Sequence, residues 1–476
     1  MKEDLKVGLF GIGLENYWGQ FTGLKMKLEN NLAHLESEMT KMHPEILNLG
    51  LIDSIDKSRK AGLRFKKENV DILFLYVTTY ALSATVIPLV KIANVPVIIL
   101  NLSPERAIDY DAFNKLQDRT KMTGEWLMHC SACPVPEIAN VFKRMGIHFH
   151  EINGVLNDPT DSCWKEIEGY IDAAKVVNSL FYNNMGVMGH YYNGMLDIYT
   201  DLTKVYRYFG GHIQIIEVDE LSALVDTVEN EEIKQKITEF ENEFEIMDDC
   251  SEHEIRRAAK TSVALDKIVK KYNLGSMAYY YKGTGNFQNA NAMSSIILGN
   301  SLLTIKGIPV AGEYEIKNCL AMKIMDLFGS GGSFTEYYAM DFDDDVVLMG
   351  HDGPGHTRIA EGKAKVKPLQ VYHGKVGDGL SIEMSVKNGP VTLLSIIEGS
   401  NNDFELLIAE GESVPGPILE IGNTNSRYRF KIPARDFVKK WNAHGPAHHC
   451  AIGVGHIAHK LKKLAHLMGI QSNQVV

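Results

Sequence analysis

Cysteine is scarce in this sequence. Its 476 residues include six cysteines: Cys130, Cys133, Cys163, Cys250, Cys319 and Cys450. Domains that depend on disulfides are much richer in cysteine, so the sequence predicts a reduced, cytoplasmic protein. Only the first two form a C-x-x-C motif. Because no second pair accompanies them, we expect ordinary packed or partly exposed thiols rather than a redox or zinc site.

Long apolar runs and an excess of basic residues are also lacking. No stretch reaches the roughly 18 apolar residues that a membrane-spanning helix needs, and the apolar segment near the N-terminus is too short and glycine-broken for a signal peptide. Lys and Arg number 49 against 60 Asp and Glu, which gives a formal net charge of −11. A nucleic-acid-binding face is basic. We therefore expect neither a membrane nor a nucleic acid as a partner.

The first segment of the chain alternates strand-like and helix-like stretches. We expect a first strand over residues 6–10, and the near-continuous apolar runs at 70–78 and 96–101 are typical of parallel strands covered on both faces. A stretch over 19–39 carries leucines at helical spacing. This rhythm predicts a doubly wound α/β domain over residues 1–170.

A loop with two glycines, Gly11 and Gly13, follows the first expected strand. A dinucleotide-binding fingerprint needs Gly or Ala where this chain has Asn16, and no acidic residue closes a strand about 20 residues later, so a nucleotide is the weaker interpretation. Loops after parallel strands hold ligands, and Trp18 and Gln20 are suited to a sugar. The alternative is an ordinary surface loop.

A second strand–helix segment follows. The sequence predicts a helix over 162–174, a strand over 175–181 and then a loop rich in glycine and aromatic residues, with His190 as a candidate sugar contact. Further strands are expected over 212–218 and 276–282, separated by charged helical stretches. We interpret residues 171–325 as a second α/β domain.

The rhythm changes after about residue 362. Short strand-like runs alternate with turn formers there. The expected strands cover residues 364–371, 380–386, 391–398, 404–410 and 427–432. This pattern predicts an antiparallel barrel or sandwich, closed by a helix over 454–468, in a third domain over residues 326–476.

The candidate chemistry lies between Pro309 and His356 and in a downstream histidine pair. The carboxylates and imidazoles stand beside glycine or proline, in segments expected to be loops or strand ends: Glu313, Glu336, His351, His448 and His449. Carboxylate oxygens combined with imidazole nitrogens suit Mn²⁺ or Mg²⁺ better than a structural zinc ion. His356 is a further candidate sugar contact.

The segments Ala311-Gly-Glu313, Ser333-Phe-Thr-Glu336, Gly350-His351 and His448-His449, in this order, resemble the L-arabinose isomerase family, within the wider group that includes L-fucose isomerase. The resemblance implies two Rossmann-like α/β domains followed by a C-terminal antiparallel β-barrel. It also implies a homo-oligomer, a trimer or hexamer, and a divalent cation, Mn²⁺ or another such as Mg²⁺ or Co²⁺.

The resemblance also implies roles for particular residues. The metal ligands are Glu313, Glu336, His351 and His449. His448 matches a histidine that faces the substrate, and His129 is similar to a histidine that an adjacent subunit lends to the site. The run over 352–356 and the loops at 17–20 and 183–201 differ from those of enzymes that act on L-arabinose, which leaves the sugar open among pentoses, hexoses and deoxyhexoses.

The implied reaction interconverts an aldose and a ketose. A divalent cation chelated by O1 and O2 polarises the carbonyl and acidifies the hydroxyl. One carboxylate then removes a proton and another returns it across a planar cis-enediol. We assign Glu336 as the base and Glu313 as the acid; the reverse assignment stays open. The alternatives are an epimerase that uses the same enediol and a sugar-binding protein without turnover.

Overall fold

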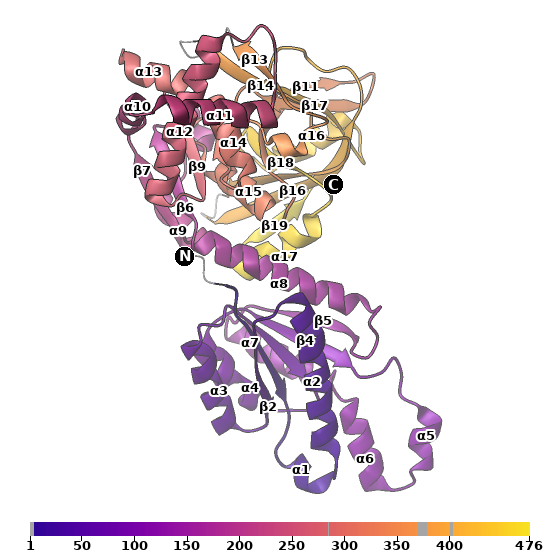
Figure 1. Ribbon diagram of the computed structural model, residues 1–476. Helices are drawn as coiled ribbons and strands as arrows, with labels where there is room; N and C mark the ends of the chain where they lie inside the picture. Colours follow the sequence, from indigo (N-terminus) through magenta and orange to yellow (C-terminus); the bar gives the residue numbers. More distant parts are fainter. Residues whose placement is uncertain (1–3, 284, 370–377, 400–402) are drawn as a thin grey trace. The chain divides into compact units, whose positions relative to one another are not determined.

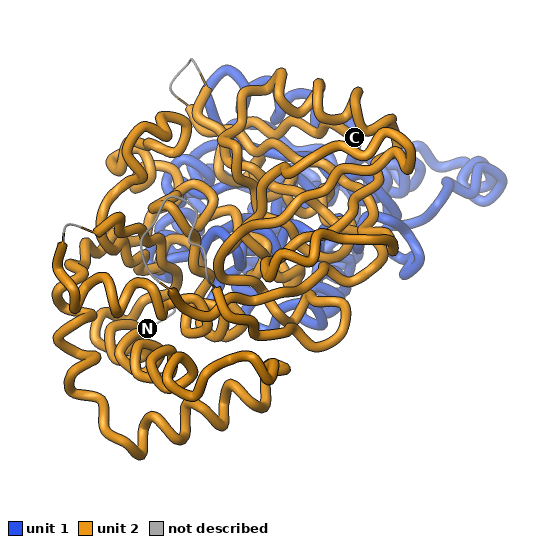
Figure 2. Tube along the Cα trace, turned by 90° about the horizontal axis from the view of Figure 1, so that it is seen from above, with its two compact units in different colours: residues 1–178 blue, residues 179–476 orange. Residues whose placement is uncertain are grey.

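The computed structural model describes residues 4–283, 285–369, 378–399 and 403–476. The chain divides into two compact units, residues 1–178 (unit 1) and residues 179–476 (unit 2), which Figure 2 colours separately. Among the helices in these described ranges, none is long and apolar enough to cross a membrane.

Unit 1 is built on a five-stranded sheet, which Figure 1 shows. The strand order is β2-β1-β3-β4-β5, and all neighbours pair in parallel. The strands are β1 (Val7–Ile12), β2 (Ile46–Ile52), β3 (Ile72–Val77), β4 (Val97–Ser103) and β5 (Phe149–Val155). Every residue of β1 and β3 is buried, as expected for strands covered on both faces. The predicted parallel α/β architecture is confirmed here.

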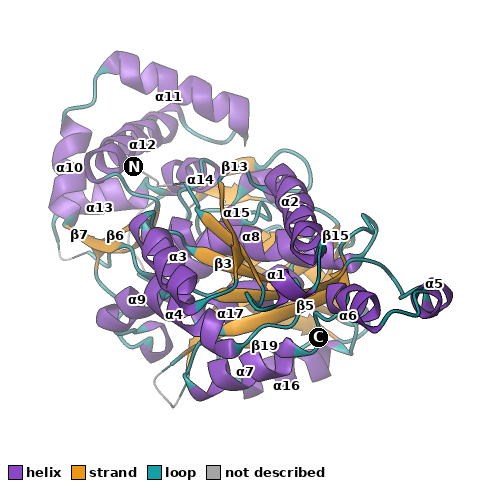
Figure 3. Ribbon diagram, turned by 90° about the horizontal axis from the view of Figure 1, so that it is seen from below, coloured by secondary structure: helices purple, strands orange, loops and turns teal. Residues whose placement is uncertain are grey.

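Helices pack on both faces of this sheet. Figure 3 shows α3 and α4 on one side of the strands and α2 and α6 on the other. The helices are α1 (Tyr17–Gln20), α2 (Leu24–Met42), α3 (Ile55–Lys67), α4 (Ser83–Ala93), α5 (Tyr110–Lys115), α6 (Arg119–Met128) and α7 (Pro134–Arg144). The helix predicted over 19–39 starts only after Gly23, whose φ of 86° separates α1 from α2.

Helix α8 (Ser162–Phe181) contradicts one prediction. The strand expected over residues 175–181 is the last part of this helix. A β-branched residue such as Val176 favours a strand by intrinsic propensity. Val176 and Leu180 are both buried, however, and a spacing of four puts them on one helix face. The strand of this region is β6 (Asn184–Gly189), inside the segment that the sequence predicts as a loop.

The first sheet of unit 2 is also parallel, with the order β10-β9-β6-β7. It joins β6 to β7 (His212–Ile216), β9 (Ser276–Tyr280) and β10 (Val310–Ala311). The helices of this part are α9 (Leu202–Phe209), α10 (Val218–Asp226), α11 (Asn230–Glu243), α12 (Glu252–Tyr272), α13 (Phe287–Ser294), α14 (Ile297–Ile305) and α15 (Ile316–Leu327). Short 3₁₀ turns stand at η1 (Leu196–Ile198) and η2 (Thr357–Ile359).

The second sheet of unit 2 has seven strands, and every pair is antiparallel except β16–β19. Its strands are β11 (Ser333–Asp341), β12 (Val346–His351), β15 (Gly389–Glu398), β16 (Phe404–Val414), β17 (Thr424–Phe430), β18 (His449–Val454) and β19 (Gln471–Gln474). Because β15 pairs with both β16 and β18, the pairings lead from β15 through β18, β11, β12, β17 and β16 back to β15.

Smaller elements complete unit 2. A three-stranded sheet joins β8 (Glu245–Ile246), β13 (Lys365–Leu369) and β14 (Gly379–Glu383). The end of the strand predicted over 364–371 lies outside the described residues. Helices α16 (Ala434–Ala443) and α17 (Ala458–Met468) follow, and the second starts later than the predicted 454–468 because Val454 ends β18. One cluster of buried apolar side chains runs through both large sheets of unit 2.

Candidate functional site

Three segments of unit 2 bring carboxylates and imidazoles together. Glu313 lies in the loop between β10 and α15, His449 is the first residue of β18, and His448 directly precedes it. Glu336 stands inside β11 rather than on the loop that the sequence predicts, and it pairs with His449 in the β11–β18 ladder. Directly paired residues of neighbouring strands point to the same face of the sheet. The register of this ladder therefore puts the second carboxylate beside the imidazoles.

The nitrogen and oxygen atoms of this cluster converge. His449 Nε2 lies 3.5 Å from Glu313 Oε2, and His448 Nε2 lies 3.8 Å from the same oxygen. His448 Nε2 is also 4.0 Å from Glu336 Oε2. Ligand atoms of Glu313, His448 and His449 all lie within 4.8 Å of one another. Since a divalent cation binds such atoms at about 2.0–2.3 Å, one ion can contact all three.

His351, the last residue of β12, borders the same cluster. Its ring centroid is 5.1 Å from that of His449. Phe334 packs against both rings, at centroid distances of 4.4 Å and 4.3 Å. All three side chains are buried. The aromatic ring thus fixes the two imidazoles by packing and keeps water from their apolar edges.

The loop that carries Glu313 has an unusual backbone. Glu313 and Tyr314 have φ angles of 57° and 64°, in the left-handed region. This conformation costs roughly 1–2 kcal/mol per residue with a side chain. The surrounding structure holds it: the Tyr314 backbone N–H donates to the carbonyl of Tyr279 at 2.9 Å. Strain of this kind persists where neighbours fix it, and it is concentrated at functional sites.

Glu315 orients His449, although it is not among the residues that the sequence motifs predict. The His449 Nδ1 atom lies 2.5 Å from Glu315 Oε2, and both side chains are buried. Burial raises the pKa of Glu315 to about 8 and lowers the pKa of His449. When Glu315 is ionised, Nδ1 donates to it and the lone pair of Nε2 faces Glu313. The only sequence signal for Glu315 is that it is the second acid of Glu-Tyr-Glu.

The side chains of His190 and His356 contact other residues of unit 2. The His190 ring packs on Tyr280, at a centroid distance of 5.4 Å, and the pKa of that tyrosine is raised by burial, by Tyr192 and also by the charge of Glu313. His356 is buried, and its Nε2 atom lies 3.7 Å from Asp326 Oδ1. The first histidine thus neighbours the Glu313 loop through Tyr280, whereas the second faces the carboxyl end of α15.

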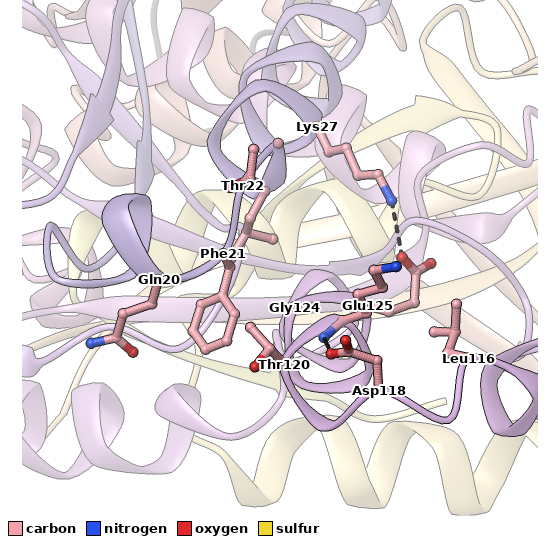
Figure 4. A pocket seen from close by; sticks show the side chains of 12 residues that line it. Gln20, Phe21, Thr22, Lys27, Leu116, Asp118, Thr120, Gly124 and Glu125 are labelled. Atoms are coloured by element: carbon pink, nitrogen blue, oxygen red, sulfur yellow. Dashed lines mark hydrogen bonds and ion pairs between the residues drawn. The ribbon is translucent and has the colours of Figure 1, made fainter.

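The remaining candidates, Trp18, Gln20 and His129, belong to unit 1. Trp18 Nε1 donates to Asp53 Oδ2 at 2.8 Å, and His129 follows the last residue of α6. Gln20 is exposed and lines a pocket of about 470 Å³ (Figure 4). The other lining residues are Phe21, Thr22, Gly23, Leu24, Lys27, Leu116, Asp118, Thr120, Lys121, Gly124 and Glu125.

Side chains pack together beside the loops that follow β1 and β3. Apolar residues from α2, α6 and the neighbouring loops form a cluster there that includes Leu24 and Leu127. Thr79 Oγ1 donates to the carbonyl of Leu127 at 2.7 Å.

Comparisons with known proteins identify two regions of the chain. The family model described as L-arabinose isomerase central domain matches residues 199–331, and the model described as L-arabinose isomerase C-terminal domain matches residues 331–471. The sulfoquinovose isomerase of Alkalicoccus urumqiensis is 21% identical over 330 residues, which is 67% of this chain and 71% of that protein.

Two L-arabinose isomerases show similar identity over a shorter span. That of Actinobacillus succinogenes is 25% identical over 280 residues, and that of Yersinia pestis is 24% identical over 281 residues. Each alignment covers 55% of this chain and 54% of the relative, so the chain spans about half the length of these enzymes. From the two consecutive domain matches and these relatives we conclude that the chain belongs to the L-arabinose isomerase family of aldose–ketose isomerases.

Proposed function

We propose that this protein is a metal-dependent isomerase of free monosaccharides whose site is the cluster of Glu313, Glu336, His351, His448 and His449. One observation carries the proposal. Donor atoms from the Glu313 loop and from the start of β18 lie within 4.8 Å of one another. A protein that only binds sugar needs no such set of carboxylates and imidazoles.

The donor set fits a divalent cation. The buried Nε2 atom of His449 has no hydrogen-bond partner among the described residues, and a buried polar atom of this kind costs free energy unless something binds it. The ligands would be Glu313, Glu336, His351 and His449, with His448 beside them. A mixed oxygen and nitrogen set without thiolate favours Mn²⁺, Mg²⁺ or Co²⁺. Such an ion supplies polarisation of the sugar carbonyl and acidification of the adjacent hydroxyl.

The chain's own carboxylates provide the proton transfers. We assign Glu336 as the base that removes the proton from the sugar carbon and Glu313 as the acid that returns it through a cis-enediol. The Glu336 side chain is 31% exposed and that of Glu313 is 16% exposed. Both carboxylates are thus partly accessible from solvent, as two groups that each exchange a proton with the sugar have to be. General acid–base catalysis of this kind supplies roughly 10²–10⁴-fold in rate.

The relatives give candidate substrates for this protein. L-Arabinose and sulfoquinovose are the sugars in their names. Trp18, Gln20, His190 and His356 remain proposed sugar contacts, and His129 is proposed to reach the site of a neighbouring subunit in a homotrimer or hexamer. Sedimentation analysis of the purified protein would measure the number of subunits.

A panel of sugars tests the proposed activity. Metal-stripped protein would be incubated with L-arabinose, L-fucose, an unmodified hexose and sulfoquinovose, each with Mn²⁺ and with EDTA. We expect a ketose that forms only with Mn²⁺. An epimeric aldose would instead support the epimerase alternative. Metal-dependent thermal stabilisation without any product would support a sugar-binding protein.

Two structural proposals accompany this function. We infer that the ring of strand pairings in the second sheet of unit 2 forms a closed β-barrel, as the resemblance implies. We also keep the division into residues 1–170, 171–325 and 326–476 as a proposal. It is supported by the two family models, which meet at residue 331, close to the second proposed boundary. The cytoplasmic location likewise stays a prediction.

A further inference from the structure

The loop between β6 and α9 is hydrogen-bonded to His448, one histidine of the proposed site. Within it, the 3₁₀ turn η1 carries Asp197, which has no role in the proposed function. Asp197 Oδ2 accepts two hydrogen bonds from His448: one from its backbone N–H at 3.0 Å and one from ring Nδ1 at 2.6 Å. The residues are 251 positions apart in the sequence. This pairing therefore results from the tertiary fold.

The contact decides which ring nitrogen of His448 faces the cluster. With Nδ1 donating to Asp197, Nε2 points toward Glu313 and Glu336, at 3.8 Å and 4.0 Å. The side chain of His448 is 37% exposed, so packing alone leaves the ring able to rotate. A hydrogen bond from the distal nitrogen to a carboxylate fixes both the tautomer and the orientation of an imidazole.

The loop that carries Asp197 is itself anchored beside Glu313. Lys317, in the first turn of α15, donates from Nζ to the carbonyl of Asp197 at 2.7 Å. Its side chain is buried. The ring of Tyr191 packs on Tyr199 of the loop and on Tyr314, both at a centroid distance of 4.8 Å. Asp197 is thus held in place by the segment that also carries the proposed acid.

We propose that Asp197 is a positioning residue: it holds the imidazole of His448 so that Nε2 faces the cation and sugar site. The inference rests on the proposed function in one respect, the assignment of that site to the cluster. It competes with a purely structural role, in which Asp197 only stabilises its own loop. The two roles differ in whether the effect of losing Asp197 requires His448.

A double-mutant cycle separates these roles. Asp197→Ala, His448→Ala and the double variant would be compared with the wild type for Mn²⁺ affinity by titration calorimetry and for kcat and KM on the sugar that the panel identifies. Loss of a residue that orients a ligand typically weakens metal binding or activity about 10–100-fold. We expect Asp197→Ala to show such a loss in the wild-type background and less than about a twofold change when His448 is already alanine.

Two further variants sharpen the test. Asp197→Asn keeps an acceptor oxygen for Nδ1, so it should retain most of the affinity that Asp197→Ala loses. Asp201→Ala is the matched control in the same loop, because Asp201 accepts hydrogen bonds from the backbone N–H groups of Thr203 and Lys204 at the start of α9. It should leave Mn²⁺ affinity and turnover unchanged.

The outcomes are distinct. Equal losses from Asp197→Ala in both backgrounds, or an equal loss from Asp201→Ala, would show that Asp197 acts through its loop and would overturn the inference. A wild-type protein that binds Mn²⁺ but converts no sugar would contradict the proposed function, while the affinity cycle would still decide the role of Asp197. A wild-type protein that binds no Mn²⁺ would overturn both.

Discussion

Residues that are not proposed metal ligands hold the ligands in place. Glu315 is hydrogen-bonded to His449, and the ring of Phe334 lies against His351 and His449. Each of these contacts joins segments that are distant in the sequence. The positions of the ligand side chains in the proposed site therefore depend on residues that neither bind the metal nor transfer a proton. Two substitutions test this description at the residue scale, one in the donor set and one beside it.

Glu336→Gln tests the proposed base. The amide keeps the size of the side chain but cannot accept a proton, so kcat should fall by at least about 100-fold. Steady-state kinetics measure this loss, and circular dichroism checks that the fold is intact. Glu412→Gln is a matched control, because Glu412 is exposed on β16. A variant at position 336 with normal turnover would place the base elsewhere.

Glu315→Gln tests the support of His449. The amide oxygen still accepts from Nδ1, but the loss of the carboxylate makes Nε2 a weaker ligand. We expect Mn²⁺ affinity to fall about 10–100-fold, measured by titration calorimetry on metal-stripped protein. The free energy of unfolding without metal should change little, since the hydrogen bond is retained. Unchanged Mn²⁺ affinity would contradict the role given to Glu315.

At the scale of elements, the ends of parallel strands set the position of the loops that follow them. β6 and β9 run side by side in parallel and end at Gly189 and Tyr280. The loop after β6 then carries Asp197, while β10, the other neighbour of β9, leads into Glu313. A change at this junction should therefore disturb the fold before it disturbs the chemistry.

Gly189→Ala should be strongly destabilising. An added Cβ would lie 1.9 Å from the carbonyl oxygen of Tyr280, at a φ of 88°. Backbone strain and the clash together should cost more than about 2 kcal/mol in free energy of unfolding. Gly194→Ala is the control, because its φ is 97° but no atom lies within 4 Å of the added Cβ. Only the backbone strain, roughly 1–2 kcal/mol, applies there. Urea unfolding measures both, and equal costs would contradict the clash.

The stability of unit 1 should depend on pH through Asp53, which precedes α3. Burial raises the pKa of Asp53, but hydrogen bonds from Lys57 and Trp18 outweigh this and hold the pKa below its ordinary value. A carboxyl whose pKa is lower in the folded state stabilises the fold above its unfolded pKa of about 3.9. That contribution is lost as the pH falls through the folded pKa.

Urea unfolding between pH 6 and pH 3, followed by tryptophan fluorescence, would measure this loss. Asp53→Asn should be less stable than the wild type above about pH 5, and the difference should shrink as the pH falls toward 3. Asp56→Asn is the control, because the Asp56 side chain is 84% exposed and forms an exposed ion pair with Arg59. A constant difference across the pH range would contradict the linkage.

At the scale of the whole molecule, the chain consists of two compact units, and all the proposed metal ligands lie in unit 2. A cation that binds the folded state alone stabilises that unit by mass action. At a free concentration of 100 times Kd the gain is about 2.7 kcal/mol. We therefore expect Mn²⁺ to raise the unfolding temperature of unit 2, and EDTA to reverse the shift.

Scanning calorimetry with and without Mn²⁺ would measure the shift, and His449→Ala should remove it. Where the two units unfold in separate transitions, only that of unit 2 should move. A shift that persists in His449→Ala would show that the stabilising ion binds elsewhere.

The sequence predicted the fold best where one local signal dominates. β3 and β4 are apolar runs, and such runs are typical of strands buried on both faces. β5 was missed because it is an edge strand with mixed polarity and few buried residues. The end of α8 was mistaken for a strand, since the β propensity of Val176 was outweighed by packing at helical spacing.

The sequence by itself determined which donors are present and that several stand beside glycine or proline, and its motifs were enough to place the chain in its family. Only the tertiary structure decided that these donors meet. Glu315 and His449 are 134 residues apart, and chain connectivity does not bring such distant residues together. The pairing of β11 with β18, and the packing of the Glu313 loop beside them, does so by burying apolar strands in one core.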